Sequence, residues 1–218
     1  RERVDVEMSV GIATGEIWLH LVGVVHQVLV VTGPAVDRCL EAESAAGAGE
    51  IRFAQTPSAD LVVDDVVDVR EQFSVRSDVA LLDPQVIAAV EAGALPEHRR
   101  AVIAFLSMDL DRDASRSANH HRLATMMRIV QLACRETEVC LLNCDVRVGG
   151  VKLTLAAGVP LTTGDDADRM LLCVTRIVEA CGVCDIAVQV GVNEGRVYSG
   201  PVGSEQRRSF TIMGDAVN

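Results

Sequence analysis

An internal repeat constrains the fold of this chain more than any other feature. Residues 10–37 align with residues 190–218 at an offset of 180, so that Gly11, Gly15 and Gly23 meet Gly191, Gly195 and Gly203. After one extra residue in the second stretch, Gly33 meets Gly214, and the apolar positions around it continue to match. An offset this long corresponds to a domain and not to a solenoid unit. The sequence therefore predicts the back part of one domain copy followed by most of a second.

The repeated stretches also predict local structure. "GIATGEIWL" and "GVNEGRVYS" each place a glycine between two apolar runs, which is typical of a hairpin turn. Gly33-Pro34 precedes a helical pattern, with proline in the first turn, where its missing N–H costs nothing. "MGDAVN" would begin the matching helix of the second copy.

The second copy has a recognisable order of elements. Strands are expected at 101–108, 139–148, 151–157, 188–192, 196–199 and 209–213, and helices at 117–138 and 165–181. This order, β-α-β-β-α-β with a further hairpin, predicts an α+β fold of the ferredoxin-like sandwich type. We expect residues 1–78 to be the C-terminal part of the first domain and 79–98 a linker that includes the helical pattern "DPQVIAAVEAG". Residues 99–218 would form the second domain, truncated at its C-terminus.

Charge and composition exclude several classes of function. The net charge of −11 disfavours nucleic acids and anionic membranes as partners, because both require clustered Lys and Arg. Residues 17–36 carry no charge over a membrane-spanning length, but His20, His26 and Gly33-Pro34 favour a sheet there. The seven cysteines, without a secretory signal, indicate reduced thiols and a cytoplasmic location. Arg1 in place of Met suggests part of a longer chain.

Several motifs together resemble the class III nucleotide cyclase homology domain. They are "RRAVIAFLSMDL", "GVPLTTGDDADRMLLCV", "VQVGVNEGRVYSGPVGSEQRRSFTIMGDAVN" and "VGIATGEIW" with "VLVVTGPAVDRCLEAESAAGAGEI". Within that family, the tandem arrangement is most similar to soluble adenylyl cyclases. The resemblance implies a site between two domains, in which one partner binds two Mg²⁺ or Mn²⁺ ions through Asp side chains. The other partner contacts the purine and the transition state, and ATP is converted to cyclic AMP and pyrophosphate.

The resemblance places the metal ligands of the second copy at two unsuitable residues. The first metal-binding Asp of the family aligns with Ser107 and the second with Val151, and neither supplies the carboxylate oxygen that Mg²⁺ requires. No metal ligand is therefore expected from this copy, and the ligands would come from the upstream half of the first domain. Asp109 and Asp145 are interpreted as solvated acids at strand ends.

The nucleotide-contacting positions of the second copy are better preserved. Thr211 falls at the purine-contacting Thr or Asp of adenylyl cyclases, and Asn218 at the catalytic Asn that orients the ribose. The purine-reading Lys aligns with Arg147, which leaves ATP and GTP both open, or with Lys152 if the hairpin register slips. In the first copy the same positions are Val30 and Asp37, and Val cannot hydrogen-bond a purine.

The losses in the two copies are complementary, so the resemblance implies one composite site in a pseudo-dimer within one chain. The chain is predicted to form part of an adenylate cyclase, which binds ATP and serves intracellular signalling. The 218 residues alone would be inactive. The alternative is a catalytically degenerate pair of cyclase-like domains that senses a nucleotide or an anion.

Overall fold

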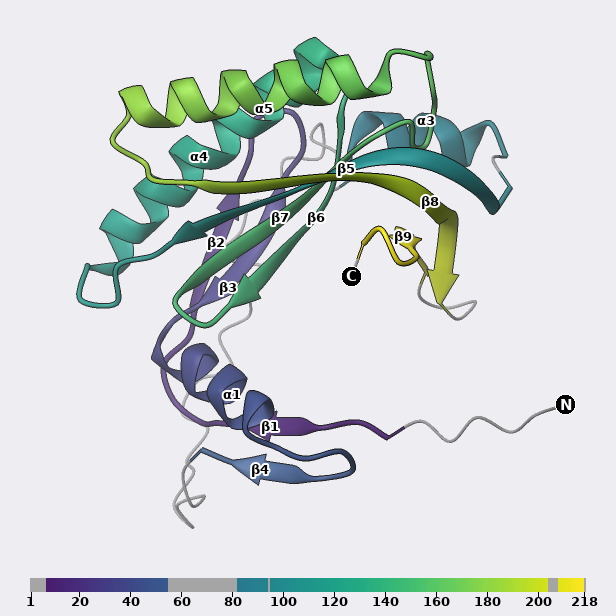
Figure 1. The fold of residues 1–218 in the computed structure, drawn as a ribbon. Coiled ribbons are helices and arrows are strands. Elements are labelled where there is room, and N and C mark those ends of the chain that lie inside the picture. The colour runs from purple at the N-terminus through teal and green to yellow at the C-terminus, as the bar shows by residue number, and fades with distance from the viewer. Residues whose placement is uncertain (1–6, 55–81, 94, 204–207, 218) are drawn as a thin grey trace, which may run out of the picture.

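The computed structural model describes residues 7–54, 82–93, 95–203 and 208–217, and its centre is a five-stranded antiparallel sheet. The strand order is β6-β7-β5-β8-β9, and α4 and α5 cover one face (Figure 1). The elements are β5 (Glu97–Asp109), α4 (Arg116–Thr137), β6 (Cys140–Arg147), β7 (Gly150–Ala157), α5 (Asp166–Val183), β8 (Gln189–Gly203) and β9 (Arg208–Met213). The predicted β-α-β-β-α-β order is confirmed, and β9 extends the sheet beyond β8.

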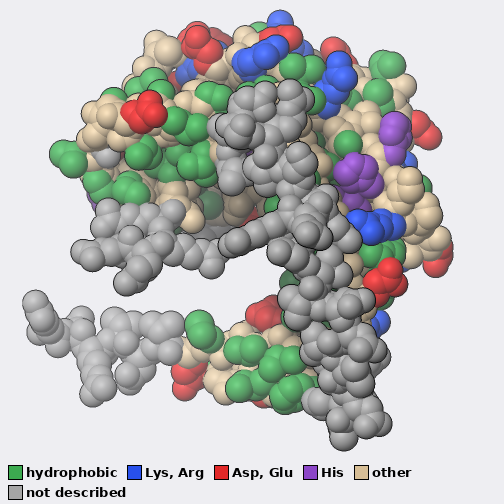
Figure 2. All heavy atoms as spheres, turned by 180° about the vertical axis from the view of Figure 1, so that it is seen from behind, with side chains coloured by type: hydrophobic (Ala, Val, Ile, Leu, Met, Phe, Trp, Pro, Cys, Tyr) green, Lys and Arg blue, Asp and Glu red, His purple; other side chains and the backbone are tan. Residues whose placement is uncertain are grey.

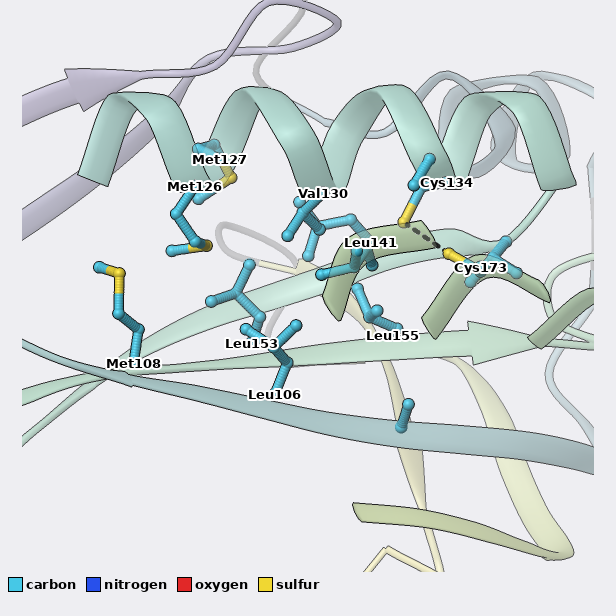
Figure 3. Packing of buried hydrophobic residues seen from close by; sticks show 14 of the residues in the cluster. Leu106, Met108, Met126, Met127, Val130, Cys134, Leu141, Leu153, Leu155 and Cys173 are labelled. Atoms are coloured by element: carbon cyan, nitrogen blue, oxygen red, sulfur yellow. Dashed lines mark hydrogen bonds between the residues drawn. The ribbon is translucent and has the colours of Figure 1, made fainter. Parts of the chain in front are cut away.

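Two apolar clusters lie on the two faces of this sheet. Under the helices, Met126, Met127 and Val130 of α4 pack onto Leu106 and Leu153 of the sheet (Figure 3). The α4 side chains recur at helical spacing and form one stripe, as a helix that covers a sheet requires. A smaller cluster on the opposite face comprises Ala101, Ile103, Ala156, Val159, Val197 and Ile212. Successive residues of β5 therefore serve alternate clusters, which makes the strand apolar throughout.

The ends of α4 explain where the helix begins and ends. Ser115 precedes it, and its side-chain oxygen accepts a hydrogen bond from the N–H of Ala118 at 3.2 Å. Glu138 follows it in the left-handed conformation, with φ of 54°. The predicted helix over 117–138 is confirmed to within one residue at each end.

Before β5, the described residues form two small sheets and two helices. β1 (Val10–Ile12) pairs in parallel with β4 (Ile51–Phe53), and β2 (Trp18–Val22) forms an antiparallel hairpin with β3 (Val28–Thr32). α1 (Pro34–Ser44) follows β3, and α3 (Pro84–Glu91) precedes β5. The hairpin contacts the second copy, with β2 against α4 and β3 against β6. The helix expected from "DPQVIAAVEAG" is confirmed, and part of the expected linker, residues 79–81, lies outside the described residues.

The two repeats make equivalent contacts at one pair of aligned glycines, Gly33 and Gly214. A Cβ on Gly33 would lie 3.2 Å from the carbonyl oxygen of Glu16, and one on Gly214 would lie 2.9 Å from that of Arg196, its counterpart. Both glycines have positive φ, 114° and 146°. The repeated glycines therefore permit a close backbone approach at the same place in each copy.

The hairpins predicted within the two glycine phrases are wrong. "GVNEGRVYS" lies inside β8, which is continuous from Gln189 to Gly203, and in the first copy β1 and β2 do not pair with each other. Gly195 serves close packing instead, because a Cβ there would lie 2.6 Å from that of Ala216. The true hairpins are β2-β3 and β8-β9. In "MGDAVN", residues 215–217 form a turn in which the N–H of Val217 donates to the carbonyl oxygen of Gly214 at 2.9 Å, as the N–H of Val36 donates to Gly33 at the start of α1.

The distribution of charge on the surface and the state of the cysteines can be compared with the sequence analysis. On the face drawn in Figure 2, acidic and basic side chains are interspersed wherever grey atoms do not cover it. All seven cysteines are free, and the Cys181-Cys184 motif lies at the end of α5. Within the described ranges, no helix is long and apolar enough to cross a membrane.

Candidate functional site

The residues that the sequence singled out line two different cavities. The open-face cavity, of about 610 Å³, lies on the face of the sheet away from α4 and α5. The junction cavity, of about 230 Å³, lies between the first copy and the β6-β7 turn of the second. Thr211 lines the first cavity and Arg147 the second.

The open-face cavity brings Thr211 of β9 together with Lys152 of β7 and Phe105 of β5. Lys152 is the only lysine among the 218 residues. Its Nζ lies 4.7 Å from the centre of the Phe105 ring, a cation–π distance. An ammonium group, a hydroxyl and an aromatic ring therefore line one recess. This combination suits a planar heterocycle, whose face can lie on an apolar surface while its edge forms hydrogen bonds.

The strand register puts Lys152 and Phe105 on one face of the sheet. Ser107 pairs with Lys152 and Phe105 pairs with Thr154 across β5 and β7, and directly opposed residues share a face. Thr211 arrives from the edge strand, where it pairs with Gly200 of β8. A Cβ on Gly200 would lie 2.9 Å from Pro96, so glycine lets the chain before β5 pack against β8.

The junction cavity is dominated by pairs of arginine and carboxylate side chains. Arg112 follows β5, and its guanidinium lies 3.6 Å from Asp37 and 3.1 Å from Glu41, both of α1. The side chain of Arg147, at the end of β6, pairs with Asp109. Asp37 also accepts a hydrogen bond from the N–H of Gly149, in the β6-β7 turn, at 3.0 Å. These contacts join the first copy to the second through charge and through one backbone hydrogen bond.

A histidine pair borders the junction cavity. His20 is fully buried in β2, and its Nε2 lies 2.8 Å from the hydroxyl oxygen of Thr32, which lines the cavity. Its Nδ1 lies 3.3 Å from that of His120 on α4, and the two rings are stacked. Burial, together with the charges of His120 and Arg116, lowers the pKa of His20 to about 4. His20 is therefore neutral at physiological pH, and its contact with His120 links the two copies.

The structure separates the predicted nucleotide-contacting residues. Thr211 lies with Lys152, the alternative to Arg147, whereas Arg147 lines the other cavity and pairs with an acid. Asn218 lies outside the described residues. Its counterpart in the first copy, Asp37, contacts the β6-β7 turn of the second copy.

The residues at the two family metal positions do not fit a metal ion. Val151 is apolar, fully buried, and pairs with Met108 on the face beneath the helices. Ser107 is the neighbour of Met108 in β5 and therefore points to the opposite face. Among the described residues, no group of three or more His, Cys, Asp or Glu side chains could hold a metal. We therefore assign no metal ligand at these two positions.

Sequence reasoning missed three contributors. Arg112 carries the junction contacts, but only its place just after a strand could have pointed to it. Phe105 looks like an ordinary core residue until the register shows that it lies beneath Lys152. Asp109, interpreted as a solvated acid at a strand end, is indeed exposed at the end of β5, and it also pairs with Arg147.

Comparison with known proteins identifies the fold. No protein-family model matches the sequence, and no curated protein matches it. A bacterial light-regulated adenylyl cyclase is similar in structure, with 14% identity, 62% of this chain and 44% of that chain covered, and a TM-score of 0.52. This chain therefore spans less than half of that structure.

Two further similar structures are guanylyl cyclases. The guanylyl cyclase Cya2 has 18% identity over 56% of this chain and 67% of that chain, with a TM-score of 0.47. The guanylate cyclase domain of RhGC from Catenaria anguillulae, solved with GTP, has 18% identity over 55% and 69%, also with a TM-score of 0.47. The structural similarity to the light-regulated adenylyl cyclase shows that the chain shares the mixed α/β fold of a nucleotide cyclase.

Proposed function

We propose that this chain contributes the nucleotide-contacting half of a class III adenylyl cyclase site. The two copies would be tandem cyclase-like domains, and the metal-binding half would come from cyclase sequence outside these 218 residues. The observation that carries the proposal is the open-face cavity, in which Lys152 and Thr211 lie together on the uncovered face of a cyclase-type sheet. Its lining thus includes two side chains that can hydrogen-bond a base edge, and one of them, Lys152, lies over the Phe105 ring.

Each of the two side chains has a defined part in this proposal. The Lys152 ammonium would donate to N1 of adenine, and the Thr211 hydroxyl would accept from the exocyclic amino group. Phe105 would support the ammonium from below. These contacts bind and orient the base, and with it the ribose hydroxyl that attacks the α-phosphate. Metal ions would neutralise the phosphates, but no residue of this chain is assigned to hold them.

The junction supports a composite arrangement of tandem domains. Asp37, in the first turns of α1, reaches the β6-β7 turn of the other copy. By the repeat, Asn218 occupies the corresponding position in the second copy. It would therefore face the equivalent turn of a partner domain, where the family places its second metal-binding Asp. The shared glycine contacts and hairpin registers favour two copies of one domain type.

The single lysine makes a direct binding test possible. The purified protein is treated with acetic anhydride at graded ATP concentrations, and acetylation is located by mass spectrometry. We expect ATP to slow acetylation of Lys152 while the α-amino group of residue 1 reacts at an unchanged rate. Thr211→Val should weaken the protection about tenfold in ATP concentration, because a hydrogen bond to a buried group is lost. Thr175→Val, an exposed position on α5 outside this cavity, is the matched control.

The outcomes separate the proposal from its alternatives. Equal protection by GTP and ATP would remove the assignment to adenylyl cyclase, and no protection by either would remove the nucleotide site. Protection should persist in EDTA, since neither Ser107 nor Val151 supplies a carboxylate to a metal ion. Cyclase activity is then assayed on a polypeptide that also carries the metal-binding half, with Asn218→Ala as the variant.

A second candidate is a regulatory module that binds nucleotide without converting it. The pairing of Arg112 and Arg147 with acids at the junction favours it, because one of the two inter-copy sites is already occupied by protein charges. ATP protection of Lys152 without cyclic AMP formation by the longer polypeptide would select this candidate.

A further inference from the structure

The last turn of α5 carries two cysteines that differ sharply in exposure. Cys181 is fully buried in the apolar cluster beneath the helices, whereas Cys184 is exposed. All seven cysteines lie in the described ranges, and Cys184 is the only exposed one, since Cys39 and Cys144 are half-buried and the others buried. Their spacing, Cys-Gly-Val-Cys, is that of a dithiol motif. The pair lines neither the open-face cavity nor the junction cavity.

The backbone holds the two cysteines at a distance that suits a disulfide. The carbonyl oxygen of Cys181 accepts a hydrogen bond from the N–H of Cys184 at 3.0 Å. The two residues between them, 182 and 183, are helical. Helix geometry separates α-carbons three residues apart by about 5 Å. In protein disulfides the α-carbons are about 4.4–6.8 Å apart, so the bond can form without opening this turn.

The chain that follows α5 keeps this turn closed. The N–H of Ile186 also donates to the carbonyl oxygen of Cys181, at 2.9 Å, and the Ile186 side chain is buried in the same cluster as Cys181. Asp185 between them has a φ of 54°, a left-handed conformation that a residue other than glycine adopts only where its surroundings impose it. Cys184 is therefore held beside Cys181 in one defined turn.

The difference in exposure gives the two thiols different parts in an oxidation. Cys184 stands at the negative end of the α5 dipole, which does not favour an anion, so its access to solvent makes it the point of entry. Burial, and then the nearby charge of Cys184, raise the pKa of Cys181 to about 11. Cys181 is therefore the slower nucleophile, and it is placed to react with its neighbour rather than with a reagent in solution.

We propose that Cys181 and Cys184 form a reversible redox site, at which hydrogen peroxide converts the two thiols to a disulfide. The Cys184 thiolate attacks one peroxide oxygen, the O–O bond breaks, and a sulfenic acid and one water form. The Cys181 sulfur then attacks the Cys184 sulfur, an S–S bond forms, and the sulfenic oxygen leaves as the second water. The two sulfurs lose the two electrons that the peroxide gains. The inference does not depend on the proposed cyclase function, because α5 lies on the opposite face of the sheet from the open-face cavity.

Peptide mapping by mass spectrometry tests the pair directly. The 218-residue protein is treated with graded hydrogen peroxide, its remaining thiols are alkylated in denaturant, and trypsin releases residues 177–196, which contain no other cysteine. We expect this peptide to escape alkylation, to be lighter by two hydrogens than its reduced form, and to regain both thiols in dithiothreitol. Dimedone, which traps sulfenic acids, should label Cys184 and lower the yield of disulfide.

Three variants separate the parts of the two thiols. Cys181→Ala should lose the disulfide and keep the dimedone adduct on Cys184. Cys184→Ser changes an exposed side chain and should leave Cys181 reduced, so the test holds even if the alanine variant folds poorly by circular dichroism. Cys39→Ser, at a half-buried thiol of α1, is the matched control and should leave the disulfide unchanged. The proposal is overturned if wild-type Cys184 is oxidised to sulfinic acid without bonding to Cys181, or if Cys181 is oxidised equally in Cys184→Ser.

Discussion

Gln131 provides the sharpest test of how the first copy is held against the second. It is 2% exposed on α4, and it forms three hydrogen bonds to the hairpin tip: two from the N–H groups of Val24 and Val25, at 2.7 and 2.9 Å, and one to the His26 carbonyl oxygen. Gln131→Leu conserves most of the volume but leaves these backbone groups without partners. At about 1 kcal/mol for each bond, the free energy of unfolding should fall by about 3 kcal/mol.

The assay uses the single tryptophan of the chain. Trp18 lies in β2, so its fluorescence reports on the hairpin, while circular dichroism reports on the whole fold. A loss of about 3 kcal/mol corresponds to a fall in Tm of about 6–12 °C for a protein of this size. Gln189→Leu, at the exposed start of β8, should change stability by no more than about 0.5 kcal/mol. A Gln131→Leu protein with the wild-type urea midpoint by Trp18 fluorescence would refute the reasoning.

Three further predictions concern a glycine pair, a histidine and a thiol. Gly11→Ala should cost about 1–3 kcal/mol in urea unfolding, because its Cβ would lie 2.2 Å from a carbonyl oxygen of α1, whereas Gly191→Ala, with open space, should be neutral. The pKa of His20 is lowered from 6.5 to about 4, so the unfolded state takes up its proton first, and stability should fall as the pH drops through this interval. The slope should be at most about 1.4 kcal/mol per pH unit, and His20→Gln should flatten it. Exposed Cys184 should react with a thiol reagent in the native protein far faster than buried Cys181, whose pKa burial raises to about 11; equal rates would contradict the burial.

The sequence predicted the second copy well because its elements are strongly periodic. The apolar stripe of α4 and the buried run of β5 each have one consistent interpretation, and both were confirmed. The glycine phrases were misread because turns and close backbone contacts both select glycine. Only the position of Ala216 opposite Gly195 distinguishes the two cases, and that contact joins residues 21 positions apart in the chain.

The sequence indicated candidate residues for the site, but it did not indicate which of them lie in the same cavity. Thr211 follows from its motif, whereas the choice between Arg147 and Lys152 depends on the side of the sheet that each side chain occupies. The register settles their positions: Lys152 pairs with Ser107 on the open face, and Arg147 lies at the end of β6 beside Asp109. Cross-strand register is a tertiary property, and a single sequence does not reveal it.

The junction and the open face differ in how their charges are balanced, and this difference has a physical cause. At the junction, Asp37 stands where the second copy has Asn218, and a carboxylate there needs a cation nearby. Arg112 supplies it from the other copy, at 3.6 Å. Val151, in the strand after the facing turn, is apolar and fully buried, so it offers no carboxylate to a metal ion. Asp37 and Arg112 are compatible neighbours, and their pairing joins α1 to the segment that follows β5. The open face has its cation, Lys152, over an aromatic ring, and under the proposed function a nucleotide base would supply a hydrogen-bond acceptor there.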